Sequence, residues 1–272
     1  MNTLKRYMRL YKVQVIQFFK TIMQSKVDFL MGLLGFFFTQ LGGILFLLLI
    51  FEQIPHLEGW TLQQLIFIYG FAQIPRGIDH LFTDNIWMIA WRMVIDGEFD
   101  RYMLRPMNLL FQVISEKLQP DAVGELLVGT ILVVYSVIKG VVVIDALHII
   151  MFIVSVFAGA LIYSAIKLFF ASLAFWVKIS APFLQAAYNM ADFAKYPTEI
   201  YASVVRFIIT WIIPFAFVAY LPASYFLGVS GFMGFDNNII VIGIECIIAV
   251  IFALIAYAVF CRGTKVYESA GN

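Results

Sequence analysis

The sequence predicts an all-α, polytopic membrane protein with six transmembrane helices of ~20 apolar residues each. Hydrophobic residues make up 62% of the 272 residues and charged residues 13%, whereas soluble domains have roughly 45–50% and about 25%. The mean hydropathy is +0.92, and a soluble chain of this length could not bury so much apolar surface. This composition excludes a disordered chain, a nucleic-acid-binding protein and a secreted disulfide scaffold. We expect one membrane domain comprising residues 1–272.

Residues 1–28 predict an amphipathic helix that lies in the membrane interface. Apolar residues recur at helical steps, and most of the basic residues fall on another side of the helix. A signal peptide is not expected, because the uninterrupted apolar run begins only at Phe29. The apolar series is Leu4, Met8, Tyr11, Val15, Phe18 and Ile22, and the basic residues are Lys5, Arg6, Arg9, Lys12, Lys20 and Lys26.

The apolar runs that follow predict the spans in order. Phe29–Phe51 contains no charge, and its glycines allow close helix packing. The fourth run is long enough to tilt or to protrude from the bilayer. Residues 222–238 are rich in Gly and Pro and too short to span, which favours a re-entrant or interfacial element. The predicted spans are residues 29–51, 61–83, 122–144, 146–176, 201–221 and 239–260.

The distribution of basic residues predicts the orientation, because Lys and Arg accumulate in the cytoplasmic loops of membrane proteins. With the N-terminus in the cytoplasm, fourteen of the 18 Lys and Arg residues lie on that side. They belong to the N-terminal helix, a long loop of residues 84–120, a link of residues 178–200 and the C-terminal tail. We expect both termini in the cytoplasm, and we expect Lys167 and Arg206 to extend to the same surface.

Sequence motifs of enzymes and ATPases are absent. The chain has no phosphate-binding pattern G-x-x-x-x-G-K-[ST] and no nucleophile flanked by a plausible base. Its 3 histidines are scattered without the spacing of a metal site. Cys246 and Cys261 lie on one predicted helix, ~22 Å apart, too far to form a disulfide. We therefore expect no catalytic residue, metal or cofactor on this chain.

Charged residues gather on the second predicted span. Arg76 shares a helix face with Asp79 and His80, because helical residues three and four positions apart are neighbours. Asp84 follows towards the cytoplasmic end, and Glu125 enters the third span from the same side. Charges at membrane depth are costly and are usually paired or functional. Two interpretations stay open: an ion-pair network that holds two helices at the inner interface, or a direct role in transport or gating.

The long loop of residues 84–120 predicts two short helices. Gly97 suits a tight turn, and Glu98 and Asp100 favour a helix start through the macrodipole. Arg105-Pro106 stops this first helix, and the proline can occupy the first position of the second.

The first of these helices has the composition of a docking element. We expect Phe99, Tyr102 and Met103 to be exposed, and aromatic residues are typical anchors of protein interfaces. The alternative is a solvated loop with an interfacial helix. From the residues alone, both interpretations remain.

Three stretches resemble the permease subunits of type-2 ABC exporters. They read IDHLFTDNIWMIAWRMVIDGEFDRYMLRPMN at residues 78–108, FAKYPTEIY at 193–201 and IIPFAFVAYLPASYFLG at 212–228. The similarity is greatest to a branch of short bacterial permeases that are encoded beside a second permease and a separate ATPase. It extends over most of the chain, and GEFDRYMLRP is its most specific part.

The resemblance implies a partner arrangement. ATP and Mg²⁺ would bind to a dimer of ATPase subunits, and a second permease protomer, identical or different, would complete the membrane unit. The unit would lie in the bacterial cytoplasmic membrane. The coupling helix, the element that contacts the ATPase, would include Gly97, Glu98, Phe99, Asp100, Arg101, Tyr102 and Arg105.

Three functions are weighed on the sequence. The first is the permease subunit of an ATP-driven exporter, with cargo passing between two protomers. The second is a membrane-embedded lipid-modifying enzyme, for which Asp79, His80 and Asp84 are the candidate side chains. The third is an ion-driven secondary transporter, which needs charges near the middle of the membrane. The expected position of the charges at helix ends argues against the third. The 28 phenylalanines suggest a lipid-like cargo or simply contact with lipid.

Overall fold

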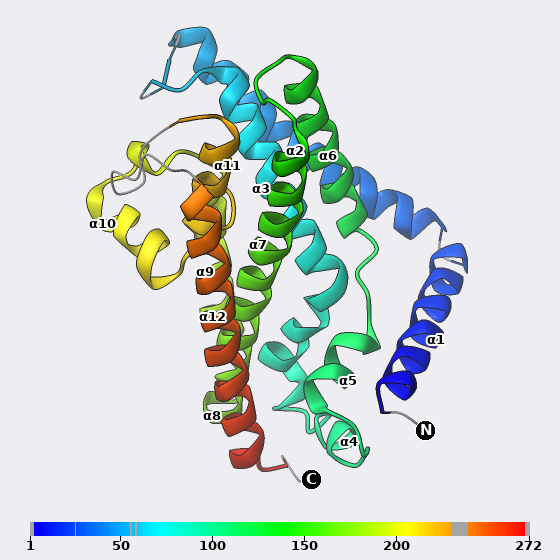
Figure 1. Cartoon of the computed structure of the whole chain (residues 1–272). Helices are drawn as coiled ribbons and strands as arrows, with labels where there is room; N and C mark the ends of the chain where they lie inside the picture. Colours follow the sequence, from blue (N-terminus) through cyan, green and yellow to red (C-terminus); the bar gives the residue numbers. More distant parts are fainter. Residues whose placement is uncertain (1–2, 25, 55, 58, 230–238, 270–272) are drawn as a thin grey trace.

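The computed structural model describes residues 3–24, 26–54, 56–57, 59–229 and 239–269. These residues form helices and no strand, apart from an isolated bridge between Leu57 and Trp60. The all-α prediction is therefore confirmed (Figure 1). The α-helices are α1 Thr3–Gln24, α2 Lys26–Gln53, α3 Leu62–Thr83, α4 Asp100–Met103, α5 Leu109–Glu116, α6 Ala122–Ile138, α7 Ala146–Ser172, α8 Ala174–Val177, α9 Ala181–Met190, α10 Ser203–Phe207, α11 Tyr220–Phe226 and α12 Ile239–Val266.

Three helical stretches are long and apolar enough to cross a membrane. They are Phe29–Gln53, Ala146–Val177 and Ile239–Val266, which match the first, fourth and sixth predicted spans. The pair Ser203–Ile212 and Phe215–Phe226 is apolar as well, but it is bent by 72°. Length and composition thus support three spans, or up to 4 if the bent pair is counted.

The second predicted span extends further than expected. α3 begins with a capping box, in which Thr61 and Gln64 satisfy each other's backbone NH groups. It does not leave the bundle at Asp84, because a 3-10 turn and a π-helical turn, Ile89–Met93, continue it. The backbone NH of Ser180 donates to the carbonyl of Ala90 at 3.0 Å. The prediction that a polar loop starts at residue 84 was therefore wrong.

The third predicted span ends early. α6 stops at Ile138 rather than at residue 144, because Gly140 adopts a left-handed conformation with φ of +70°. The NH of Gly140 bonds to Val137 and the NH of Val141 bonds to Ser136, which closes the helix in a glycine C-cap.

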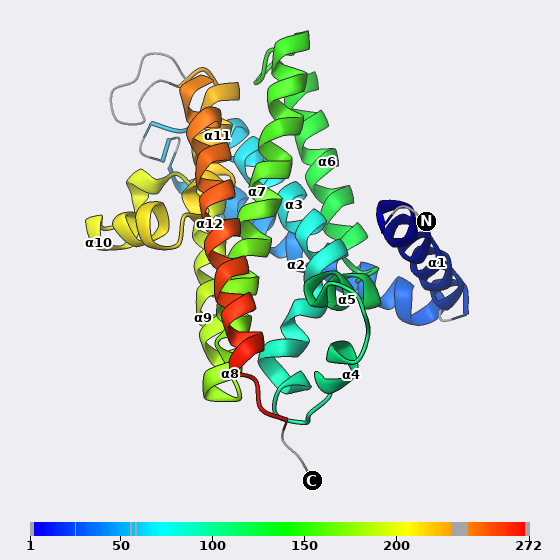
Figure 2. The same ribbon diagram turned by 60° about the horizontal axis from the view of Figure 1, so that its bottom comes forward.

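The fifth predicted span, residues 201–221, is wrong as a single helix. After α8 the chain turns back, and α9 with the 3-10 turn Ala191–Lys195 runs antiparallel to α3. Tyr188 contacts Asp79, whereas the Lys195 ammonium, further along the chain, lies 5.5 Å from the ring centre of Tyr69, which is earlier on α3. Residues 181–195, assigned to a cytoplasmic link from the sequence, therefore pack along one side of the bundle (Figure 2).

The bent pair that follows lies beside the bundle, with α11 in the half away from the termini (Figure 1). Tyr220 donates to Glu199 at 2.7 Å, and its ring packs on Trp60, which precedes α3. Arg206 donates to the carbonyls of Thr198 and Glu199 in this region. The expectation that Arg206 extends to the surface carrying the termini was wrong.

The helices α7 and α12 run parallel and pack against each other along their length. The Ser155 hydroxyl donates to Glu245 at 2.6 Å, and the rings of Phe175 and Phe260 lie 5.9 Å apart further along. Glu245 is fully buried, so its partner is a neighbouring helix rather than solvent. In Figure 1 both chain ends lie at the same end of the bundle as α4, α5 and α8.

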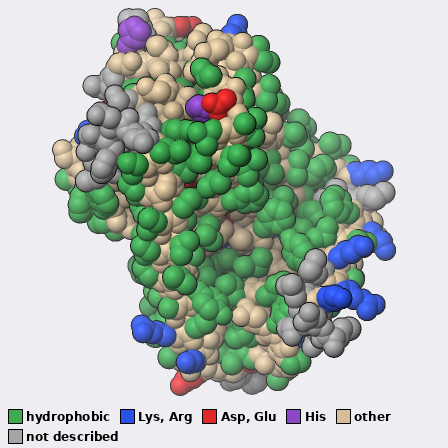
Figure 3. Space-filling view, viewed as in Figure 1, with side chains coloured by type: hydrophobic (Ala, Val, Ile, Leu, Met, Phe, Trp, Pro, Cys, Tyr) green, Lys and Arg blue, Asp and Glu red, His purple; other side chains and the backbone are tan. Residues whose placement is uncertain are grey.

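The helix α1 lies apart from this centre. Tyr11, Val15 and Phe18 are half-buried, which agrees with the predicted apolar side of the helix, whereas Leu4, Met8 and Ile22 are outside the described side chains. The basic side chains on this helix form a positive edge of the molecule (Figure 3). Those described as exposed are Lys5, Arg9, Lys12 and Lys20.

Candidate functional site

A buried ion pair lies at the centre of the candidate site. The Lys167 ammonium on α7 lies 2.9 Å from Asp79 Oδ2 on α3, and both side chains are fully buried. Asp79 also accepts hydrogen bonds from Thr83 (2.5 Å), Ser164 (2.8 Å) and Tyr188 (2.5 Å). These four donors come from α3, α7 and α9, so a single carboxylate ties three helices together.

Lys167 has further partners within the same pocket of polar groups. Its ammonium lies 3.3 Å from Asp84 Oδ1 and 3.4 Å from the Thr83 hydroxyl. The ring of Tyr188 lies 5.5 Å from the same ammonium, in cation–π range. The expectation that Lys167 extends to the membrane surface was therefore wrong, because the buried carboxylates stabilise the cation inside the bundle.

Glu125 forms a second centre of charge on α6. It is fully buried between Arg76, whose Nε lies 3.5 Å from Oε1, and His80, whose Nδ1 lies 3.0 Å from Oε2. Both are ion-pair distances without the alignment of a hydrogen bond, so the Glu125 oxygens have no hydrogen-bond donor among the residues that the structure describes. The ring of His80 stacks on Tyr188, which joins this centre to Asp79.

Asp192 forms the third centre and is accessible. Arg76 Nη1 and the Lys195 ammonium lie 3.1 Å and 2.8 Å from the same Asp192 oxygen. The Asp192 side chain is 60% exposed, whereas Arg76 is 20% exposed. The network thus runs from a closed interior at Asp79 to an open surface at Asp192.

The network lies in the middle of the bundle rather than at its inner end. Gly159 packs against Pro75, and Ser164 bonds to Asp79. Within the span Ala146–Val177, Gly159 is 13 residues from the first residue and Ser164 is 13 residues from the last. The position of Arg76, Asp79, His80, Asp84 and Glu125 relative to the inner interface stays a prediction; the structure adds that helical turns continue α3 to Met93.

Small residues bring α3 and α6 close enough for this network to form. A Cβ atom at Gly129 would lie 2.9 Å from the carbonyl oxygen of Gly70, and one at Gly77 would lie 2.8 Å from Leu126. Such contacts between glycines are typical of membrane helix pairs. They hold Glu125 against Arg76 and His80.

Sequence reasoning brought together the correct residues of α3 and α6 but missed their partners. The structure adds Lys167, Tyr188, Asp192 and Lys195 to the predicted set. One signal was present in the sequence: Lys167 is a lone cation in an otherwise apolar helix, and such a residue requires a partner.

The predicted docking helix is anchored in the bundle. Gly97 turns the chain with φ of +69°, and Phe99 is fully buried against Phe175 and Tyr267, at 5.1 and 5.3 Å between ring centres. Tyr102 is also buried and donates to Glu116 of α5. Burial and this hydrogen bond raise the pKa of Tyr102 to about 12, so its hydroxyl stays a donor.

The exposed part of this segment differs from the prediction. Phe99 and Tyr102 were expected to be exposed, and this was wrong because both rings fill the contact with α5, α8 and α12. Leu104 is 85% exposed and Met103 is 48% exposed. With exposed Arg105, these residues form the outward surface, which we call the docking surface.

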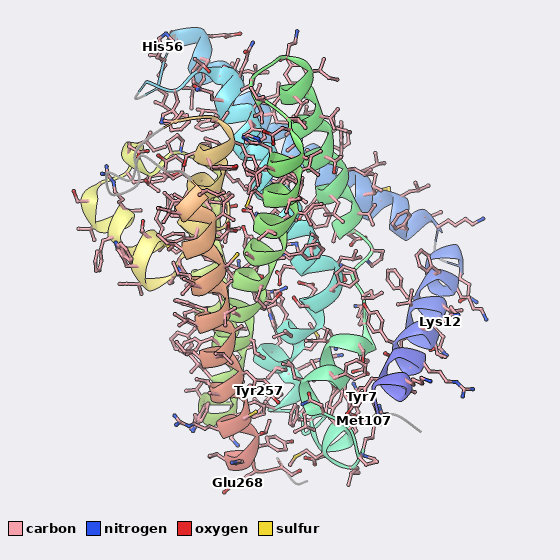
Figure 4. All side chains as sticks on the ribbon, viewed as in Figure 1. Tyr7, Lys12, His56, Met107, Tyr257 and Glu268 are labelled. Carbon is pink, nitrogen blue, oxygen red and sulfur yellow. The ribbon has the colours of Figure 1, made fainter. Side chains whose placement is uncertain are left out.

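Asn108 connects the segment to two other helices. It caps α5, which starts at Leu109 and not at Pro106 as predicted. Its backbone NH donates to the Tyr7 hydroxyl of α1 at 3.0 Å, and its side-chain amide donates to the Tyr257 hydroxyl of α12 at 3.2 Å. Figure 4 shows Tyr7 and Tyr257 near Met107, far from His56 at the opposite end of the molecule.

The described residues contain no group of three or more His, Cys, Asp or Glu side chains placed to hold a metal ion. A bundle of apolar helices with an internal ion-pair network and an anchored surface loop defines a polytopic membrane protein. The family model described as ABC-2 family transporter protein matches residues 36–271. The chain therefore belongs to the ABC-2 family of transporter proteins. No curated protein and no solved structure matches it.

Family membership settles the general role. The chain is a multi-pass membrane component, a permease, of an ABC transporter. Members of this family are transport components rather than ATPases, so the chain works with an ATPase subunit.

Proposed function

We propose that this chain is the permease subunit of a bacterial ABC exporter. ATP and Mg²⁺ bind to a dimer of ATPase subunits, and hydrolysis drives cargo between two permease protomers, which are identical or different. The proposal rests on the family match across residues 36–271. The docking surface supports it, because Met103, Leu104 and Arg105 are exposed next to one another at the end of the bundle that carries both termini, which makes them accessible to a partner subunit.

The anchoring of the docking segment suggests how force is transmitted. Leu104 faces outward, while Phe99 is packed against Phe175 of α8 and Phe260 of α12. A push by the ATPase on the docking surface would therefore move α8 and α12 with α4. Packed aromatic contacts of this kind transmit rigid-body movement because cores are close-packed.

The orientation is part of the proposal. With both termini and the docking surface in the cytoplasm, six crossings would be α2, α3 to Met93, α6, α7–α8, residues 181–195 and α12. The bent pair would be a re-entrant element at the outer face. The positive-inside pattern still supports this arrangement after Lys195 and Arg206 are removed from the cytoplasmic side, because the basic N-terminal helix and the loop remain there.

The lipid-modifying enzyme does not gain from the structure. Asp79 is fully buried and accepts four donors, so it is unavailable as a catalytic base. The ion pair of Lys167 and Asp79 lies beside the middle of α7, so the position of the charges does not count against an ion-driven secondary transporter. The family match favours ATP as the energy source.

Purification of the tagged chain from its native membranes tests this function. We expect an ATPase subunit in equal number to the permease protomers, and ATP-dependent export that stops when the ATPase is removed. Export driven by an ion gradient in the purified chain alone would contradict the proposal.

A further inference from the structure

A polar stripe follows α3 from its outer end to its centre. Tyr69, Gln73, Arg76 and His80 are spaced by four, three and four residues, so they share one face of the helix. The face is met by Gln40 of α2, whose amide donates to Gln73 at 3.1 Å and whose oxygen accepts from Tyr69 at 2.6 Å. The Gln73 amide nitrogen is buried and has no hydrogen-bond partner within the described part of the chain.

A second polar stripe lies on α9 and the 3-10 turn that follows it, and is open to the surface. Gln185, Asn189 and Asp192 are spaced by four and three residues, and all three are exposed. The Gln185 amide donates to Asn189 at 2.9 Å. This stripe leads along α9 towards the level of Arg76, where Asp192 meets the polar face of α3.

The exposure of Asp192 is unusual at this depth. Its side chain is 60% exposed and lies beside Arg76, at the level of residues 159–164 in the centre of the span Ala146–Val177. A carboxylate that faces hydrocarbon is strongly disfavoured, and intramembrane charges usually face a water-filled cavity. On α7 the surface at this level is apolar: Phe157 is 62% exposed, and Figure 3 shows an apolar face over α7 and α12.

We propose that the stripe Gln185, Asn189 and Asp192, together with Arg76, lines the water-filled path along which a polar or charged part of the cargo crosses the membrane. The inference rests on the proposed transport function and adds which face of the chain borders the path. A charged group on the cargo would find both signs there, since Asp192 is paired with Arg76 and Lys195 at its exposed edge. A purely hydrocarbon cargo would have no use for this lining.

Thiol accessibility tests the inference on the intact complex. In a chain with Cys246→Ala and Cys261→Ala, single cysteines replace Asp192 and, as the matched control of similar exposure and depth, Phe157. A charged, water-soluble methanethiosulfonate is added to both sides of the membrane. We expect Asp192→Cys to react about 10-fold faster or more than Phe157→Cys, because the thiolate is the reactive form and apolar surroundings suppress it.

A second variant avoids disturbing the ion pairs. Asn189→Cys lies on the same stripe without contacting Arg76 or Lys195, and it should also react faster than Phe157→Cys. Slow labelling at both positions would overturn the inference, whether lipid or a second protomer covers the stripe. If the stripe is labelled quickly but no ATPase is associated with the chain, the water-filled path stands and the exporter proposal is contradicted. If the stripe is labelled slowly while the ATPase is bound, the exporter proposal stands and the path is contradicted.

Discussion

Lys167 and Asp79 form a fully buried ion pair, with 2.9 Å between the ammonium and the carboxylate. The Lys167 ammonium also lies 3.3 Å from Asp84 Oδ1, and the Tyr188 hydroxyl donates to the same Asp79 oxygen, Oδ2, that faces Lys167. The pair therefore joins α3 to α7 inside the bundle, and the Tyr188 hydroxyl adds α9. Removing the ion pair should show how much it contributes to the stability of the packing between the three helices.

Replacing Lys167 with Met leaves Asp79 as an uncompensated buried charge. We expect a loss of about 3–5 kcal/mol in stability, the usual effect of removing one partner of a buried pair. Thermal unfolding in detergent measures it, with Lys178→Met as the control because Lys178 is exposed. The double variant Asp79→Asn, Lys167→Met should recover part of the loss. Equal melting of Lys167→Met and the control would show that the pair does not stabilise the fold.

Phe99 should behave as a core residue rather than as a docking contact. Phe99→Ala removes a ring packed among Phe175, Phe260 and Tyr267, and such a substitution costs about 3–5 kcal/mol. Leu104→Ala, by contrast, should leave the melting temperature unchanged because its side chain is 85% exposed. Similar melting of the two variants would contradict the burial of Phe99.

The close approach of α3 and α6 predicts a sharp contrast between two glycines. Gly129→Ala places a Cβ 2.9 Å from the Gly70 carbonyl, and overpacking of this kind costs about 1–3 kcal/mol. Gly35→Ala meets nothing within 4 Å and should be neutral or stabilising, since alanine favours a helix. Unfolding curves of both variants measure the change in the free energy of unfolding. An unchanged value for Gly129→Ala would contradict the close approach of α3 and α6.

Periodicity and charge in the sequence predicted the helices α2, α3, α7 and α12 well, because a long apolar run between charged residues is compatible with few structures other than a helix. They failed for residues 181–195, where short polar stretches resemble a loop. The polarity there is satisfied by side chains distant in sequence, such as Asp79 and Arg76, and a local pattern does not show such partners.

The candidate site shows the same limit. The shared face of Arg76, Asp79 and His80 follows from helical spacing, whereas its depth depends on the continuation of α3 beyond Asp84. That continuation occurs because Asp84 pairs with Lys167 and Asn85 donates to the Val113 carbonyl. Likewise, aromatic residues in a loop suggest a partner, but Phe99 finds its partner within the chain.

The most direct test of the account is ATPase binding by a docking-surface variant. Leu104→Asp with Arg105→Asp changes exposed side chains only, and Lys117→Asp is the matched control, an exposed charge reversal beyond α5. We predict that the double variant reaches the membrane with normal thermal stability but loses the ATPase on co-purification, whereas the control retains it. Full retention of the ATPase by the double variant would contradict the assignment of residues 103–105 as the docking surface.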